Sequence, residues 1–160
     1  MAYTAAFTGA RRSELLRMQV SDLDLDGGTI VVQEKKRVRG QLTTRRVPLA
    51  KGLEIVLRNY LARHPGGDLL FCQLDESPTP RSISTKMAHR HLRWSLAKSK
   101  WSVIRGWHIF RHGFVSACAS KGIDQRLIQT WCGHMSAETS ARYAHLYPST
   151  QRTAIDSVFN

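Results

Sequence analysis

His108 and Arg111 are the residues of this chain whose types and spacing most directly suggest chemistry. They stand three positions apart, so on a helix both side chains project from one face. An arginine guanidinium offers a rigid fork of donors that suits two phosphate oxygens, and a histidine can give or take a proton near neutral pH. The pair therefore suits binding to a phosphodiester. A solvent-exposed helix start can carry the same two residues, so the choice between these interpretations depends on other residues of the chain.

Arg11 offers a second guanidinium near a predicted helix start. It follows Gly9, which ends a short amino-terminal helix, and Glu14 comes three residues later. On a helix this carboxylate can hold the Arg11 guanidinium in place. The alternative is a surface ion pair, which stabilises a protein by only about 0.2–1 kcal/mol.

His108 and His112 stand four positions apart, a spacing at which two histidines on a helix can share a zinc ion. A zinc enzyme of this kind also needs an acidic third ligand or a glutamate base, and neither accompanies the pair in the sequence. We therefore expect no metal and no other cofactor.

Basic residues outnumber acidic ones by a wide margin. Lysine and arginine number 24 against 12 aspartates and glutamates, which gives a formal net charge of +12 and a pI near 10.4. An excess of this size in a compact domain predicts a polyanionic partner, and double-stranded DNA is the partner we expect.

Part of this positive charge lies on a predicted hairpin and on one helix. Residues 29–34 are rich in β-branched side chains and residues 47–49 close a returning strand, with a basic turn between them. We expect DNA contacts from the turn and from a helix over residues 82–98, at Arg37, Arg39, Arg45, Lys86 and Arg90. The alternative for the turn is a solvated edge kept basic against aggregation, and a plain solvent-exposed face is equally favoured for the helix.

A mainly helical domain with a small antiparallel sheet has to position these residues. Hydrophobic periodicity and capping residues predict helices over 11–18, 51–64, 82–98, 108–120, 124–132, 136–147 and 149–159. With 42% apolar residues, a chain of 160 residues is expected to form one domain.

Other features of the sequence concern location. No apolar run reaches the ~18 residues that a membrane span requires, so we expect no contact with a membrane. The three cysteines lack any close pairing and predict reduced thiols in the cytoplasm. The chain opens as if within a helix, which suggests a fragment of a longer protein.

Five short motifs in a fixed order resemble the catalytic domain of the tyrosine recombinases, the phage integrase family. The resemblance runs over nearly the whole chain, and its carriers are residues 8–15 (TGARRSEL), 46–49 (RVPL), 108–112 (HIFRH), 132–134 (CGH) and 139–146 (TSARYAHL). It implies the fold of those catalytic domains, which is mainly helical with a small antiparallel sheet. It also implies that the amino-terminal DNA-binding domain of such enzymes is absent from residues 1–160.

The resemblance assigns a role to each matching position. Arg11 and Arg111 are similar to the two phosphate-binding arginines, and His108 is similar to the general base. His134 is similar to a residue that hydrogen-bonds the phosphate. Tyr143 is similar to the nucleophile of the family, although a lone tyrosine on a helix is usually a packing residue.

The hairpin lysine of the family matches Lys35, and Lys36 is a rival because the turn is longer than usual. The sequence departs from the family pattern at Ala10, where a larger apolar residue is common, at Gly113, where a hydroxyl residue is common, and at Trp131, where leucine is common. None of these departures removes a catalytic group.

The implied chemistry is sound on physical grounds. A free tyrosine has a pKa of ~10, so at neutral pH its ionised form is disfavoured by ~4 kcal/mol. Two arginines and a histidine around a phosphate can offset much of this deficit, and a lysine can protonate the leaving 5′ oxygen. The product, a 3′-phosphotyrosyl bond, conserves the bond energy, so strands can be rejoined without ATP.

We therefore expect a site-specific recombinase or integrase catalytic domain that works as a tetramer on DNA. Two alternatives are a type IB topoisomerase-like enzyme, which relaxes DNA alone, and a non-catalytic DNA-binding remnant. The recombinase hypothesis requires Arg11, His108, Arg111 and His134 to converge on one pocket the size of a phosphate, with Tyr143 aimed into it.

Overall fold

The computed structural model describes residues 1–38, 41–73, 80–104, 106–133 and 135–147, with the backbone alone at positions 35–38 and 41–42. Its elements, in chain order, are α1 (Ala2–Thr8), α2 (Arg12–Leu15), a 3₁₀ turn (Val20–Asp22), β1 (Leu23–Asp24), β2 (Thr29–Val38), β3 (Gln41–Pro48), α3 (Lys51–Leu61), α4 (Thr85–Leu96), α5 (His108–Ser120), α6 (Gln125–Cys132) and α7 (Ala137–Ala144). The predicted mainly helical architecture with a small antiparallel sheet is confirmed. None of the helices in these residues is both long and apolar enough to cross a bilayer.

The sheet contains one strand more than the predicted hairpin. Its strands are antiparallel and lie in the order β1-β2-β3, with Leu23 of β1 opposite Ile30 of β2. The register of β2 against β3 shifts between Gln33 and Arg37. Pro48 ends the edge strand β3, as predicted, because an edge position needs no ladder hydrogen bond from the missing N–H.

The helices agree with the sequence-based ranges to different degrees. The bounds of α5 are those predicted, whereas α3, α4, α6 and α7 are shorter than expected by one or more residues at their ends. The prediction of a helix over 11–18 was wrong beyond Leu15, because the chain turns there and Gln19 pairs with Leu69. The helix predicted over 149–159 lies outside the described residues.

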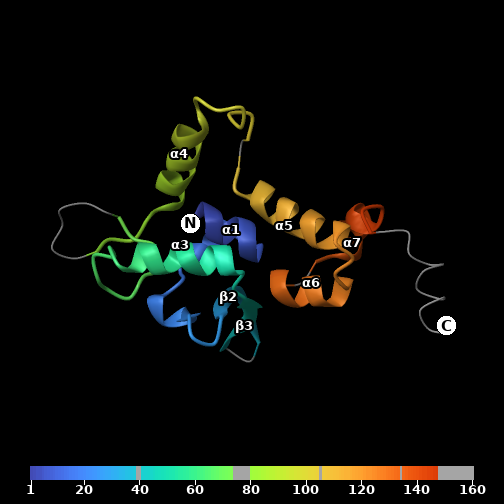
Figure 1. Ribbon diagram of the computed structural model, residues 1–160, viewed down its shortest axis with the longest axis horizontal. Helices are drawn as coiled ribbons and strands as arrows, with labels where there is room; N and C mark the ends of the chain where they lie inside the picture. The colour runs from blue at the N-terminus through green and yellow to red at the C-terminus, as the bar shows by residue number, and fades with distance from the viewer. Residues whose placement is uncertain (39–40, 74–79, 105, 134, 148–160) are drawn as a thin grey trace.

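Two hydrophobic clusters hold the elements together. The larger cluster packs α1, α2 and α4 against the sheet around Leu15, Ile30 and Val47. The smaller cluster joins α5, α6 and α7 around Val115 and Ile128. Figure 1 shows α5 running from the region of α1 to α6 and α7, and α5 packs against all three. Helix α5 therefore connects the two clusters.

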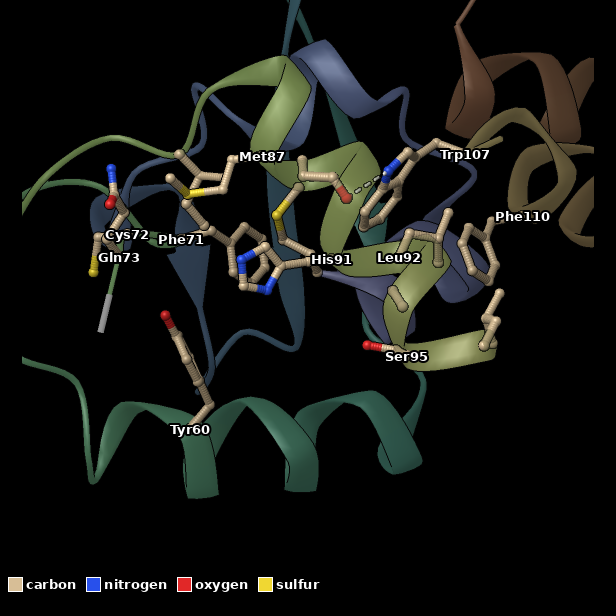
Figure 2. A pocket seen from close by; sticks show the side chains of 15 residues that line it. Tyr60, Phe71, Cys72, Gln73, Met87, His91, Leu92, Ser95, Trp107 and Phe110 are labelled. Carbon is tan, nitrogen blue, oxygen red and sulfur yellow. Dashed lines mark hydrogen bonds between the residues drawn. The ribbon is translucent and has the colours of Figure 1, made fainter. Parts of the chain in front are cut away.

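An apolar cavity of about 660 Å³ opens between α3, α4 and the start of α5. Figure 2 shows Tyr60, Leu92, Trp107 and Phe110 among the side chains that line it, and the Trp107 indole N–H donates a hydrogen bond to the Ala88 carbonyl at 3.3 Å. Of the predicted catalytic residues whose side chains the structure describes, none lines this cavity.

Candidate active site

A sharp turn after α1 positions Arg11. Gly9 ends the helix with φ +64°, in the left-handed region, and a Cβ atom at this position would lie 2.7 Å from the Cys132 sulfur. Arg11 follows in extended conformation as the N-cap of α2. Its side chain is 38% exposed, so the guanidinium can reach an external anion.

Glu14 holds Arg11 as the sequence predicts. The Glu14 carboxylate accepts hydrogen bonds from the Arg11 backbone N–H at 2.7 Å and from its guanidinium at 3.0 Å. The alternative, a surface ion pair between Arg11 and Glu14, is excluded because the Glu14 residue is buried and only 3% exposed. Burial raises the pKa of this carboxyl, but the hydrogen bonds and charges of Arg45 and Arg11 outweigh that effect, and its pKa lies below the ordinary value of 4.5.

The structure differs from the expectation for Arg45, which was predicted to contact DNA. Arg45 is 8% exposed and donates to both Glu14 oxygens, at 2.7 and 3.2 Å, and to Glu34 at 3.2 Å. It also donates to the Trp131 carbonyl at 2.7 Å. Four of the five guanidinium N–H groups are engaged by two carboxylates and a carbonyl, and the side chain is buried, so Arg45 cannot present a fork of donors to a phosphate. We therefore correct this prediction and assign Arg45 to support of the site.

Arg111 is buried where α1 and α6 meet α5. It is 7% exposed and donates to the backbone carbonyls of Gly9, at 3.0 Å, of Cys132, and of Gly133, at 3.5 Å. These carbonyls engage three of the five N–H groups of the guanidinium and do not neutralise its charge. Burial lowers the pKa of Arg111, and Arg11 and Arg45 also lower it, but an arginine remains protonated at neutral pH. This site therefore carries fixed positive charge that can stabilise an anion.

His108 begins α5 beside the two cations. A pocket of about 340 Å³ is lined by Arg11, Arg12, Ser13 and His108, together with Gly106 and Trp107. Partial burial lowers the pKa of His108, and the charges of His112, Arg111 and Arg11 lower it further. The lowered pKa favours the neutral imidazole, which is the form that can accept a proton.

Tyr143 lies on α7, whose first turn is capped by Ser136 through a 3.2 Å hydrogen bond from the Thr139 N–H. Its ring packs in the smaller hydrophobic cluster and is 8% exposed. The phenol is hydrogen-bonded to His112 Nδ1. Burial raises the pKa of Tyr143, while the positive charge of Arg111 acts in the opposite direction.

The structure brings Arg11 and His108 together in one pocket, whose lining includes neither Arg111 nor Tyr143. Arg111 follows His108 by one turn of α5, and its charge lowers the pKa of His108 and opposes the rise in the pKa of Tyr143. His134, the remaining residue of the predicted convergence, lies outside the described residues.

The hairpin residues are only partly described. Lys35, Lys36 and Arg37 belong to β2 and their side chains are not described, and Arg39 lies outside the described residues. Lys86 and Arg90 are exposed on α4, as a DNA-binding or solvated face requires.

Sequence reasoning missed the roles of His112, Glu34 and Arg45. His112 was weighed only as a zinc ligand, and its four-residue spacing from His108 was the one signal that could have pointed to the same helix face. Among the described residues, no group of three side chains has the composition and proximity of a metal site.

Comparison with known proteins places this architecture among DNA-processing enzymes. The model of the phage integrase family matches residues 1–150. The tyrosine recombinase XerH of Helicobacter pylori is 28% identical over 146 residues, which cover 87% of this chain and 38% of that protein.

Solved structures agree with this result. The crystal structure of XerA recombinase is 29% identical, with a TM-score of 0.71, and the match covers 96% of this chain and 54% of that chain. The Tn1549 transposon integrase in complex with circular intermediate DNA shares the fold at 18% identity, with a TM-score of 0.68, and the match covers 99% of this chain and 56% of that chain. The chain thus spans about half or less of the length of these proteins.

Proposed function

Because this chain belongs to the phage integrase family and has the fold of tyrosine recombinase catalytic domains, we propose that it is the catalytic domain of a site-specific DNA recombinase. It cleaves and rejoins DNA strands through a 3′-phosphotyrosyl intermediate. The nucleophile and the cations are all side chains, so the proposed reaction uses neither a metal nor ATP.

The observation that carries this proposal is a pocket lined by Arg11 and His108, with the guanidinium of Arg111 held by backbone carbonyls one turn along the same helix as His108. Positive charge that is fixed in place before the substrate arrives stabilises the extra negative charge of a phosphoryl transition state without reorganisation. Arg111 is held by carbonyls and Arg11 by Glu14, so both guanidiniums are oriented in advance.

The proposed roles follow from these positions. Arg11 and Arg111 bind the non-bridging oxygens of the scissile phosphate, and His134 adds a hydrogen bond to it. Tyr143 attacks the phosphorus, and its phenolic proton passes to a histidine. The hairpin lysine, Lys35 or Lys36, protonates the 5′ oxygen as the P–O5′ bond breaks. In rejoining, a 5′-hydroxyl attacks the phosphotyrosine and the protons return.

Several features support double-stranded DNA as the substrate. The net charge of +12 suits a polyanion, and Lys86 and Arg90 present exposed cations on α4. The Tn1549 integrase, which shares the fold, was solved with DNA. We also propose DNA contacts for Arg37 and Arg39 on the hairpin, assembly as a tetramer on DNA, and a cytoplasmic location, with which the free thiols of Cys72, Cys118 and Cys132 agree.

A covalent-adduct assay tests the proposal. A nicked duplex that carries the attachment site of the encoding element traps the intermediate, because the short 5′-hydroxyl strand diffuses away after cleavage. The unmodified protein should form an adduct that survives denaturing electrophoresis. Tyr143→Phe should abolish the adduct while DNA binding persists, and Tyr147→Phe, which removes another phenol of the same segment, should retain it.

Other outcomes would replace the proposal with one of its alternatives. Binding without an adduct on any attachment-site duplex would indicate a non-catalytic DNA-binding protein. An adduct accompanied by supercoil relaxation, but never by strand exchange between two sites, would indicate a topoisomerase-like enzyme.

A further inference from the structure

The two histidines of the α5 motif lie in different parts of the site. His108 lines the pocket that contains Arg11, on the side where the phosphate is proposed to bind. His112 lies one helical turn later, and its Nδ1 is hydrogen-bonded to the Tyr143 phenol. The two imidazole rings meet edge to face with centroids 5.5 Å apart. The histidine in contact with the attacking oxygen is therefore His112.

We propose that His112 is a catalytic residue that takes the phenolic proton of Tyr143 during cleavage, and that His108 acts on the phosphate side. This inference rests on the proposed function, because it concerns the same strand-cleavage reaction. It assigns proton transfer to a residue different from the one that family resemblance alone would select.

Packing keeps the donor and the acceptor together. Helix α7 packs against α5, and Tyr143 is buried in the cluster that contains Val115, one turn further along α5 from His112. The His112 and Tyr143 rings are tilted by 34° with centroids 6.2 Å apart. His112 itself is exposed, so a proton that it accepts can exchange with solvent or remain for the return step.

The proton transfer balances without any additional reactant. Neutral His112 with its hydrogen on Nε2 accepts the phenolic hydrogen bond at Nδ1. As the Tyr143 oxygen bonds to phosphorus, its O–H bond breaks and an N–H bond forms on Nδ1. The P–O5′ bond breaks, and the hairpin lysine supplies the proton to O5′. During rejoining His112 returns its proton to the phenolate as it leaves.

The acidity of the nucleophile shows why a base in contact is needed. Burial raises the pKa of Tyr143, so the phenolate does not form unaided at neutral pH. A positioned general base typically accelerates such a step by about 10²–10⁴-fold. The contribution of a general base to the reaction rate should decrease when the phenol is made more acidic. The contribution of a residue with a purely structural role should not change.

The test compares two nucleophiles in single-turnover adduct formation on the nicked duplex. Tyr143 is retained or replaced by a ring-fluorinated tyrosine, whose phenol is more acidic. Each form is combined with His112→Ala, His112→Gln, His108→Ala or Ser120→Ala, the last being an exposed control at the end of α5. Thermal melts identify any variant that fails to fold, and His112→Gln provides a second variant at the same site.

With tyrosine, both His112 variants should slow adduct formation by about 100-fold or more. With fluorotyrosine, at a pH where that phenol is ionised, their deficit should fall to less than about 10-fold. His108→Ala should show the same deficit with both nucleophiles, and Ser120→Ala should show none. Folded His112 variants with near-normal rates, or with a deficit that is equal for both nucleophiles, would overturn the inference. An unmodified protein that forms no adduct would overturn the proposed function as well, and is a different result.

Discussion

Individual charged residues in the site are held by partners of different kinds. Arg45 is neutralised by Glu14 and Glu34, whereas Arg111 is held by backbone carbonyls and keeps its charge available. Buried ion pairs of the first kind support geometry, and buried cations of the second kind create a binding site for an anion. The charges of Arg111 and Arg11 lower the pKa of His108.

At the residue scale, Arg11→Ala should raise the pKa of His108. Partial burial lowers this pKa from its ordinary value of 6.5, and electrostatic interactions that include those with Arg111 and Arg11 lower it further, so the substitution removes one of these interactions. An NMR titration of the His108 ring should therefore show a midpoint below 6.5 that moves upward in the variant. Arg46→Ala removes an exposed arginine of β3 and serves as the control. An unchanged midpoint in Arg11→Ala would show that the two groups are not coupled.

Secondary-structure elements converge on the site through Glu14. Its carboxylate links the start of α2 to β3 through Arg45, and Arg45 in turn reaches β2 through Glu34 and α6 through the Trp131 carbonyl. One buried ion-pair network thus positions the turn that bears Arg11 and the helix that precedes residue 134.

At the element scale, Glu14→Gln should destabilise the fold by about 3–5 kcal/mol at pH 7, because it leaves part of a buried ion pair uncompensated. The pKa of Glu14 is lowered in the folded state, so its contribution is fully present above the ordinary value of 4.5 and is lost as the pH falls through the folded pKa. The difference in the free energy of unfolding between the unmodified protein and Glu14→Gln, measured by urea denaturation, should therefore become smaller at acid pH. Glu138→Gln, which breaks an exposed pair with Arg142, should change stability by less than about 1 kcal/mol.

A second prediction at this scale concerns the turn after α1. Gly9→Ala should destabilise the protein by more than about 1 kcal/mol, because it places a Cβ at positive φ and 2.7 Å from the Cys132 sulfur. It should also slow adduct formation, since Arg111 binds the Gly9 carbonyl. Gly52→Ala, in α3 with no atom near the added Cβ, should instead leave the melting temperature unchanged or raise it. Equal melting temperatures for the two variants would contradict this account.

The whole molecule is strongly cationic, and its proposed partner is a polyanion. Exposed cations on α4 lie on an element whose apolar side, at Ala88 and Leu92, packs into the larger cluster. The basic side of α4 is thus displayed on a rigid support. Contacts of this type with the DNA backbone give affinity that depends on salt and little on sequence.

At the molecular scale, the double substitution Lys86→Ala and Arg90→Ala should weaken binding to every duplex tested by a similar factor. Each lost phosphate contact should reduce the slope of log K against log salt concentration by about 1. Fluorescence anisotropy over a salt series measures both effects. Arg63→Ala, an exposed cation after α3, is the control for net charge. If the slope does not differ from that of the control, the basic side of α4 faces solvent and does not contact DNA.

Much of the fold was predictable because the signals are local. The bounds of α5 and the caps of α6 and α7 at Asp124 and Ser136 depend on residues within one or two turns. The Arg11–Glu14 pair was predictable for the same reason, since it spans three positions. The early end of α2 was not predicted, because the pairing of Gln19 with Leu69 overrode the local helical pattern.

By itself, the amino-acid sequence determined the helix positions, the cationic character and the set of residues that suit phosphodiester chemistry. Only the tertiary structure decided that Arg45 is buried beside Glu14, 31 positions away, and that His112 contacts the Tyr143 phenol across the same sequence separation. Local conformation depends on neighbouring side chains, whereas these contacts depend on how α5, α7 and the sheet pack. Packing is a property of the whole core, and no single motif encodes it.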